Sequence, residues 1–100
     1  MRLSAEEQKI IKELAQQEFG SGTRVYIFGS RSDDTKKGGD IDLFITNKNK
    51  KKLTLKAKIS YLARLKSTIG EQKIDVVLDT HASQSKKSFY QSIKKTALEI

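Results

Sequence analysis

Apolar positions in this chain recur every three or four residues in three segments, which is the spacing of an amphipathic α-helix. The first segment opens with the capping-box sequence Ser4-x-x-Glu7 and ends near Gly20. The second runs from about Leu53 to Thr68 and is stopped by Gly70. The third is short, with apolar positions at Phe89, Ile93 and Ala97. The pattern therefore predicts three helices.

Three shorter segments have the composition of β-strands. Residues 24–28 are β-branched and aromatic and stop at Gly29. In residues 40–46 the apolar side chains Ile41, Leu43 and Ile45 share one face of a strand, and in residues 73–78 Ile74, Val76 and Leu78 do the same. Alternating helices and strands predict one α+β domain over residues 1–100, with a small mixed three-stranded sheet in an αβαβαβ-like order. We expect the helices to cover one face of the sheet and to leave the other open.

Carboxylates occupy that second face. In a strand over residues 40–46, Asp40 and Asp42 point the same way, about 6 to 7 Å apart. Asp75 is the polar position of the later strand, and if the two strands pair, all three aspartates converge. Such a cluster is costly unless a cation occupies it. Hard divalent ions such as Mg²⁺ prefer ligation by oxygen alone, so the pattern predicts a Mg²⁺ site.

A Gly-Ser turn follows the first strand and supplies groups for a phosphate. Gly29 lets backbone N–H groups approach an anion without a Cβ in the way. Ser30 opens a possible helical turn whose N–H groups and hydroxyl can donate to phosphate, and Arg31 is a further candidate ligand.

Structural explanations compete with these roles. Aspartates at strand edges also discourage aggregation, a serine also caps helices, and an arginine such as Arg31 is more often a solvated charge than a ligand. His81 follows the third strand in a polar segment and is expected to be a bystander. Tyr61, Phe89 and Tyr90 have helical spacing, which favours packing over base stacking. The combination of Gly29-Ser30 with all three aspartates favours a binding site.

The pair Gly29-Ser30, nine intervening residues, Asp40-x-Asp42 and the later Asp75 resemble the signature of the polymerase-β-like nucleotidyltransferase superfamily, and in particular its minimal nucleotidyltransferase (MNT) family. The resemblance implies that Asp40, Asp42 and Asp75 ligate two Mg²⁺ ions and that Asp75 helps to activate the attacking hydroxyl. It also implies that Gly29 and Ser30 hold the triphosphate of ATP or another nucleotide. The MNT family implies a helical HEPN-type partner protein, encoded alongside, in a toxin–antitoxin pair.

Composition narrows the setting. The chain has 100 residues and no cysteine, so neither a disulfide nor a thiolate-metal site supports it. No segment approaches the ~20 apolar residues that span a bilayer, and the N-terminus has no signal-peptide pattern, which predicts a cytoplasmic protein without membrane contact. With 20 Lys and Arg against 12 Asp and Glu, the net charge is +8. Much of the excess lies in Lys48, Lys50, Lys51, Lys52, Lys56 and Lys58.

Two functions fit these features. The first, which the resemblance to the MNT family implies, is a Mg²⁺-dependent nucleotidyltransferase that moves AMP from ATP to a hydroxyl of a partner protein. The small domain agrees with this, since we expect it to leave no room for an acceptor domain. The second is a non-catalytic basic module that neutralises or scaffolds a protein or RNA, because a positive surface attracts all such anions through the same screened field. The complete set of three aspartates favours the enzyme, and nucleic acid is the less favoured partner.

Overall fold

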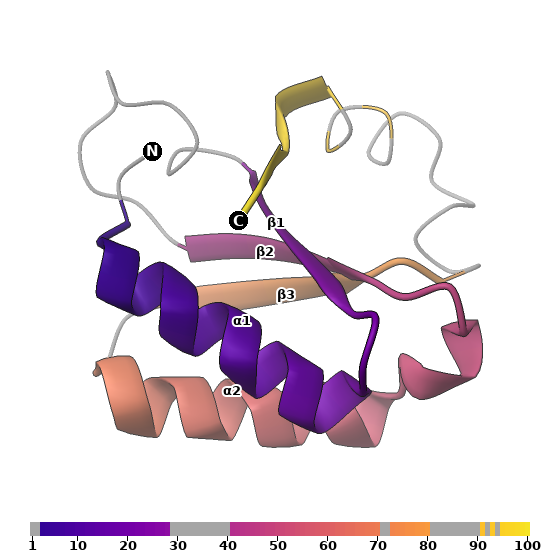
Figure 1. Ribbon diagram of the computed structural model, residues 1–100, viewed down its shortest axis with the longest axis horizontal. Coiled ribbons are helices and arrows are strands. Elements are labelled where there is room, and N and C mark those ends of the chain that lie inside the picture. The colour runs from indigo at the N-terminus through magenta and orange to yellow at the C-terminus, as the bar shows by residue number, and fades with distance from the viewer. Residues whose placement is uncertain (1–2, 29–40, 71–72, 81–90, 92, 94) are drawn as a thin grey trace.

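The computed structural model describes residues 3–28, 41–70, 73–80, 91, 93 and 95–100 of the chain (Figure 1). Among these residues, the strands β1 (Arg24–Phe28), β2 (Ile41–Thr46), β3 (Ile74–Leu78) and β4 (Leu98–Glu99) form one sheet in the order β3-β2-β1-β4. β1 runs antiparallel to β2 and β4, whereas β2 and β3 are parallel. The predicted mixed sheet is confirmed.

Helices α1 (Ala5–Phe19) and α2 (Leu55–Ile69) lie side by side on one face of the sheet, as Figure 1 shows. The capping box that opens α1 is formed, since Glu7 N donates to Ser4 Oγ over 3.0 Å and Ser4 N donates to Glu7 Oε1 over 3.1 Å. Thr54 caps α2 by accepting from Ala57 N. The helices end at Gly20 and Gly70, so both predicted stop signals are confirmed.

The core lies between these two helices and the sheet. The inward side chains of β2 are completely buried, and in β3 Ile74 and Val76 are nearly so, while Leu78 is partly buried. Tyr61 of α2 is also fully buried, and its hydroxyl donates to the backbone carbonyl of Ile11 in α1 over 2.9 Å. Its ring meets Phe19 edge to face, with centroids 5.4 Å apart. Tyr61 therefore joins the two helices, which confirms packing as its role; Phe89 and Tyr90 lie outside the described residues.

The C-terminal segment differs from the prediction. Among its described residues, 91, 93, 95 and 96 are helical as expected, but Leu98 and Glu99 form β4. β4 pairs with β1, so the sheet has four strands where the sequence pattern predicted three. A strand of two residues is too short to show alternation, and only the free edge of β1 makes it possible. The helical turn expected from Ser30 lies outside the described residues.

The face opposite the helices is only partly open. Phe44 of β2 lies on that face and is nevertheless 5% exposed, whereas Asp75 of β3 is exposed. Phe44 contacts Tyr26 of β1, with ring centroids 6.3 Å apart. The expectation of a fully open aspartate face is therefore wrong at Phe44, because a phenylalanine there is stable only when it is covered. Within the described residues, neither helix has the length and hydropathy of a transmembrane segment.

Gly20 provides a test of how α1 ends. Gly20 and Gly70 both have φ +95°, with ψ 171° and 179°, a conformation available essentially to glycine alone. A Cβ at Gly20 would lie 3.0 Å from Lys52 Cδ, whereas a Cβ at Gly70 would meet nothing within 4 Å. We expect Gly20→Ala and Gly70→Ala each to lower the free energy of unfolding by about 1–3 kcal/mol. Gly20→Ala should be the more damaging, since the Lys52 side chain must also move away from the negative end of the α1 dipole.

Urea unfolding of both variants measures these losses, and Gly70→Ala is the matched control for backbone strain without a side-chain contact. A Gly20→Ala protein as stable as the parent would show that the chain leaves α1 in another conformation.

Candidate active site

Asp42 and Asp75 lie next to each other on neighbouring strands. β2 and β3 pair in parallel with Asp42 directly beside Asp75. Because side chains alternate along a strand, both aspartates point away from the face that α1 and α2 cover, while Ile41, Leu43 and Val76 point toward it. Adjacent strands are about 4.8 Å apart, so the two carboxylates are neighbours. The predicted pairing of these strands is confirmed.

The two carboxylates differ in their surroundings. Asp42 is half-buried and Asp75 is exposed. Two negative groups at this spacing repel each other, and a cation that both can bind removes the repulsion. The pair therefore has the donor chemistry of a site for a hard divalent cation, with Asp75 accessible to a molecule arriving from solvent.

The end of β1 lies beside Asp42. In the antiparallel pairing of β1 with β2, Phe28 is opposite Asp42, and Phe28 is the residue that precedes Gly29. The chain therefore leaves β1 at the same end of the sheet as the two carboxylates. Four predicted site residues lie outside the described residues, namely Gly29, Ser30, Arg31 and Asp40.

A metal site with three acidic ligands is therefore not complete within the described part of the chain, which contains no group of three or more His, Cys, Asp or Glu side chains arranged to hold an ion. Asp42 and Asp75 are brought together; the position of Asp40 relative to them stays a prediction. His81, expected to be a bystander, also lies outside the described residues.

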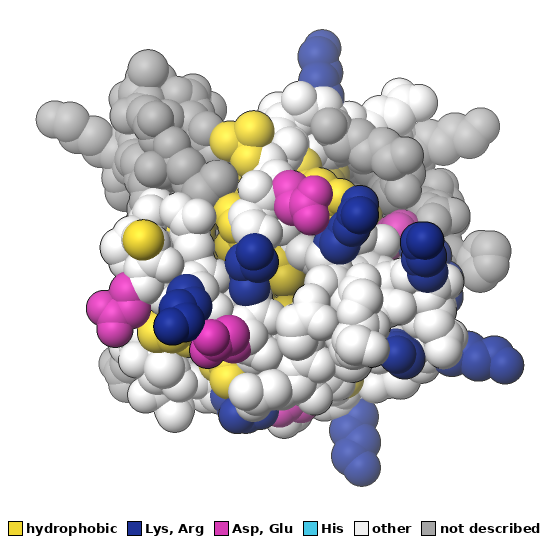
Figure 2. All heavy atoms as spheres, in the orientation of Figure 1, with side chains coloured by type: hydrophobic (Ala, Val, Ile, Leu, Met, Phe, Trp, Pro, Cys, Tyr) yellow, Lys and Arg dark blue, Asp and Glu magenta, His cyan; other side chains and the backbone are white. Residues whose placement is uncertain are grey.

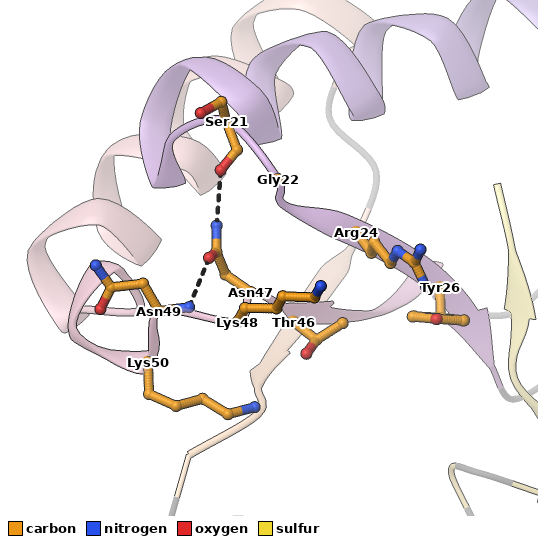
Figure 3. Close-up of a pocket in the computed structure, with 9 residues that line it drawn as sticks. All are labelled: Ser21, Gly22, Arg24, Tyr26, Thr46, Asn47, Lys48, Asn49 and Lys50. Atoms are coloured by element: carbon orange, nitrogen blue, oxygen red, sulfur yellow. Dashed lines mark hydrogen bonds between the residues drawn. The ribbon is translucent and has the colours of Figure 1, made fainter.

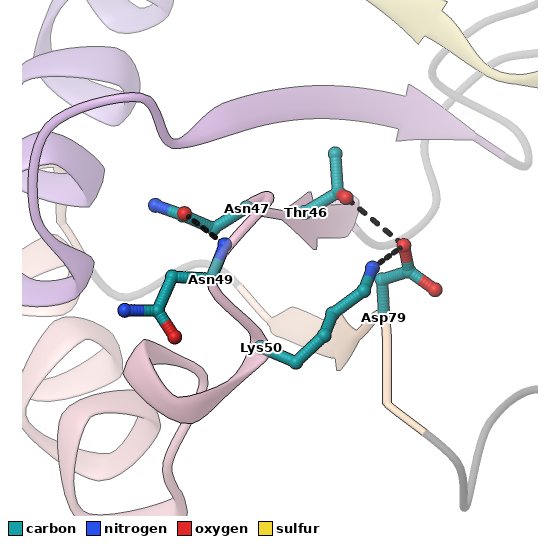
Figure 4. Close-up of polar contacts among 5 residues, drawn as sticks. All are labelled: Thr46, Asn47, Asn49, Lys50 and Asp79. Carbon is teal, nitrogen blue, oxygen red and sulfur yellow. Dashed lines mark hydrogen bonds and ion pairs between the residues drawn. The ribbon is translucent and has the colours of Figure 1, made fainter.

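A further carboxylate, Asp79, has a structural role that the sequence pattern did not reveal. It follows β3, and its side chain is only 9% exposed. Thr46 Oγ1 donates to Asp79 Oδ2 over 2.9 Å, and the ammonium of Lys50 forms an ion pair with the same oxygen (Figure 4). Asp79 N donates to the carbonyl of Ile45 over 2.9 Å. Asp79 therefore ties the ends of β2 and β3 together, at the other end of the strands from Asp42 and Asp75.

The lysine-rich segment after β2 is more ordered than a solvated loop. Residues Lys50–Lys52 form the short 3-10 helix η2, capped by Asn49, whose side chain accepts from Lys51 N. Lys50 is held by Asp79, and Lys52 lies against Gly20. Figure 2 shows Lys and Arg side chains spread over the visible face of the molecule, some of them in the region of η2 and the start of α2. The basic excess is therefore partly used to join this segment to the rest of the fold.

Comparison with known proteins agrees with this architecture. The family described as "Polymerase beta, Nucleotidyltransferase" matches residues 8–100. No curated protein matches the chain. A chain in the crystal structure of a mutant of the toxin–antitoxin MntA-HpeT is similar, with a TM-score of 0.67 and 21% sequence identity, covering 93% of this chain and 70% of that chain. At this identity the likeness shows a shared fold.

The family match spans nearly the whole chain, and the shared fold includes the sheet that carries Asp42 and Asp75. The predicted α+β class and the resemblance to the polymerase-β-like nucleotidyltransferase superfamily are both confirmed. The chain belongs to the polymerase-β nucleotidyltransferase family.

Proposed function

We propose that this chain is a Mg²⁺-dependent nucleotidyltransferase that transfers AMP from ATP to a hydroxyl group of a partner protein. The observation that supports this most is the register of β2 and β3, in which Asp42 is beside Asp75 on the face away from the helices. Two adjacent carboxylates repel each other, and a divalent cation that both bind removes this repulsion. Membership of the nucleotidyltransferase family supports the same assignment.

The residues divide into three roles in this proposal. Asp40, Asp42 and Asp75 would hold Mg²⁺, and the oxygen-only donor set of the two described aspartates suits this ion. Bound Mg²⁺ supplies Lewis-acid stabilisation of the charge on the transferring phosphate. Gly29, Ser30 and Arg31 follow Phe28 in the sequence, the residue of β1 that pairs opposite Asp42, and would bind the triphosphate.

In the transfer, the acceptor oxygen forms a bond to the α-phosphorus, and the bond from this phosphorus to the α–β bridging oxygen breaks. Pyrophosphate leaves with the bond electrons, and the hydroxyl proton passes to the carboxylate of Asp75 or through it to water. Asp75 suits this role, because it is the exposed member of the pair and an acceptor hydroxyl can reach it from solvent. Asp42, half-buried, suits a binding role.

The partner is proposed to be the toxin of a toxin–antitoxin pair, a helical protein of the HEPN type, with this chain as the antitoxin. The structurally similar chain comes from the toxin–antitoxin MntA-HpeT. The mutant in that crystal structure exchanges two aspartates, two positions apart, for glutamate, and Asp40 and Asp42 have the same spacing here. These observations support the proposal of a partner protein and a functional role for the pair Asp40 and Asp42.

The test is to purify the chain together with its bound protein and to incubate the pair with ATP and Mg²⁺. We expect intact-mass analysis to find the partner heavier by one or more AMP groups, with pyrophosphate released in equal amount. Omitting ATP should leave the partner mass unchanged, because the AMP donor is missing. Adding EDTA in excess should do the same, because the charge on the ATP phosphates is then not offset by Mg²⁺. A partner that stays unmodified with ATP and Mg²⁺, but is still bound and neutralised, would refute the transfer.

A further inference from the structure

A second site lies at the opposite end of the sheet from the two aspartates. It is a surface pocket of about 710 Å³, formed by the start of β1, the end of β2 and the segment that leads into η2 (Figure 3). Arg24, Tyr26 and Thr46 line it from the face of the sheet that carries Asp42. Thr46 is four residues beyond Asp42 on β2, a separation of about 13 Å along the strand. The pocket is thus separate from the candidate active site.

The charges in this pocket are of one sign. Its described lining includes the cations Arg24, Lys48 and Lys50 and no Asp or Glu. Lys50 is held by Asp79, and Arg24 contacts Glu99 only at 3.9 Å, with both side chains well exposed. Within the described residues, Lys48 is exposed and no carboxylate pairs with it. Exposed pairs at such distances contribute little, so Arg24 and Lys48 are available to an anion.

The pocket also has an aromatic wall on a rigid support. Tyr26 is half-buried in the middle of β1, and its ring packs against Phe44. The floor is fixed by Asn47, which is buried and donates to the carbonyl of Ser21 and to Thr23 Oγ1, at 3.2 and 3.0 Å, while its own oxygen accepts from Asn49 N. Both N–H protons of the Asn47 amide are therefore used within the fold, and the cations Arg24 and Lys48 and the ring of Tyr26 line the pocket as groups that a ligand can contact.

We propose that this pocket binds single-stranded nucleic acid, with phosphates at Arg24 and Lys48 and a base against Tyr26. Cations beside an aromatic ring are the combination that binds phosphate and base together, whereas an acidic peptide would use only the charge. Lys51 in η2 and Lys56 in the first turn of α2 are also exposed and follow the pocket segment in the chain, so a strand has further cations within the same region that a mononucleotide would not use. This function does not depend on the proposed transfer reaction.

The experiment measures fluorescence anisotropy of labelled 12-nucleotide RNA and DNA strands with the intact chain, with AMP and a 12-residue glutamate peptide as competitors. We expect either strand to bind, the tighter one identifying the physiological source, and neither competitor to displace it at equal concentration. Arg24→Ala combined with Lys48→Ala should reduce the slope of log affinity against log salt by about 1.4, the value for two lost phosphate contacts. Displacement by the peptide as effective as by unlabelled strand would overturn the proposal in favour of an acidic protein.

The matched control is Lys9→Ala combined with Lys66→Ala, two exposed lysines on α1 and α2 that remove the same charge on the helical side of the sheet. The slope of log affinity against log salt for this control should equal that of the parent. Equal slopes in the two double variants would show that the strand binds through the overall positive charge of the protein, and would refute a specific site at the pocket.

Tyr26→Leu should weaken binding about fivefold or more, and Tyr26→Phe, which keeps the ring, should not. Thermal unfolding followed by circular dichroism identifies any loss of strand binding that is due to misfolding. If Tyr26→Leu is unfolded, Tyr26→Phe tests the stacking of the base instead. A Tyr26→Phe protein that binds the strand as weakly as the double alanine variant would exclude stacking. Asp75→Asn should bind the strand like the parent, which separates this site from the catalytic proposal.

Discussion

Replacing Asp75 by asparagine is expected to reduce AMP transfer by about 10²- to 10⁴-fold, the range for loss of a general acid–base group. The substitution removes the carboxylate that accepts the proton. The asparagine amide has nearly the same size as this carboxylate and keeps one oxygen that can accept a hydrogen bond. Because Asp75 is exposed and projects away from the core, the fold should be unchanged. Binding of ATP with Mg²⁺ should be largely retained through Asp40 and Asp42, since a group that acts in the transition state appears in rate more than in ground-state affinity.

The measurement pairs single-turnover transfer to the partner protein with calorimetry of ATP binding. Glu13→Gln makes the same chemical change at an exposed position of α1, on the other side of the sheet, and should transfer AMP at the parental rate. An Asp75→Asn chain that transfers AMP as fast as the parent would remove Asp75 from the mechanism. An Asp75→Asn chain that neutralises its partner as well as the parent does, with no AMP on the partner, would favour the alternative function of a non-catalytic binding module.

The largest effect on stability is expected at Tyr61. Tyr61→Ala deletes a fully buried ring that packs edge to face on Phe19 and should cost about 3–5 kcal/mol. The total stability of a domain is about 5–15 kcal/mol, so this variant should be partly unfolded at 37 °C. Tyr61→Phe keeps the ring and loses only the hydrogen bond to the carbonyl of Ile11, at a cost of about 1 kcal/mol. Urea unfolding compares the three proteins.

Tyr61 also makes stability depend on alkaline pH. Burial raises the pKa of its hydroxyl above the ordinary value of 10.0, because the phenolate would lose its hydration. Above pH 10 the unfolded chain gives up this proton while the folded chain keeps it, so the unfolded state binds fewer protons and stability falls as pH rises. The stabilisation is complete below pH 10 and is lost toward the raised pKa.

Tyr61→Phe should therefore lose less stability between pH 9 and about pH 11.5 than the parent does. Other tyrosines and the lysines titrate in both proteins, and the difference between the two curves isolates Tyr61. Parallel curves would mean that the hydroxyl is not buried in solution.

The candidate site is predictable in part from the sequence. Alternation in residues 40–46 and 73–78 assigns Asp42 and Asp75 to polar faces, because the period of a strand allows no other arrangement once the apolar residues are buried. The pairing of their strands is a hypothesis that the register of β2 and β3 confirms. Gly29, Ser30, Arg31 and Asp40 lie outside the described residues, and their roles remain predictions.

Other features have no signal in the sequence. Lys50 and Asp79 are 29 residues apart, and a pattern of local spacing contains nothing to connect them. The pocket places Arg24 of β1 near Lys48 of the segment after β2. These two residues come together only because β1 and β2 pair in the register that the structure shows. β4 has two residues, fewer than an alternating pattern requires.

The sequence by itself determined the local structure: the capping box at Ser4 and Glu7, the helix ends at Gly20 and Gly70, and the face of each strand. These depend on interactions among residues a few positions apart, or on one backbone conformation, and so they can be inferred from spacing alone. Only the tertiary structure decided which strands are neighbours, and therefore that Asp42 lies beside Asp75 and that Asp79 receives Lys50. Those contacts join distant segments, and the burial of one shared core, rather than any local preference, selects the arrangement that forms them.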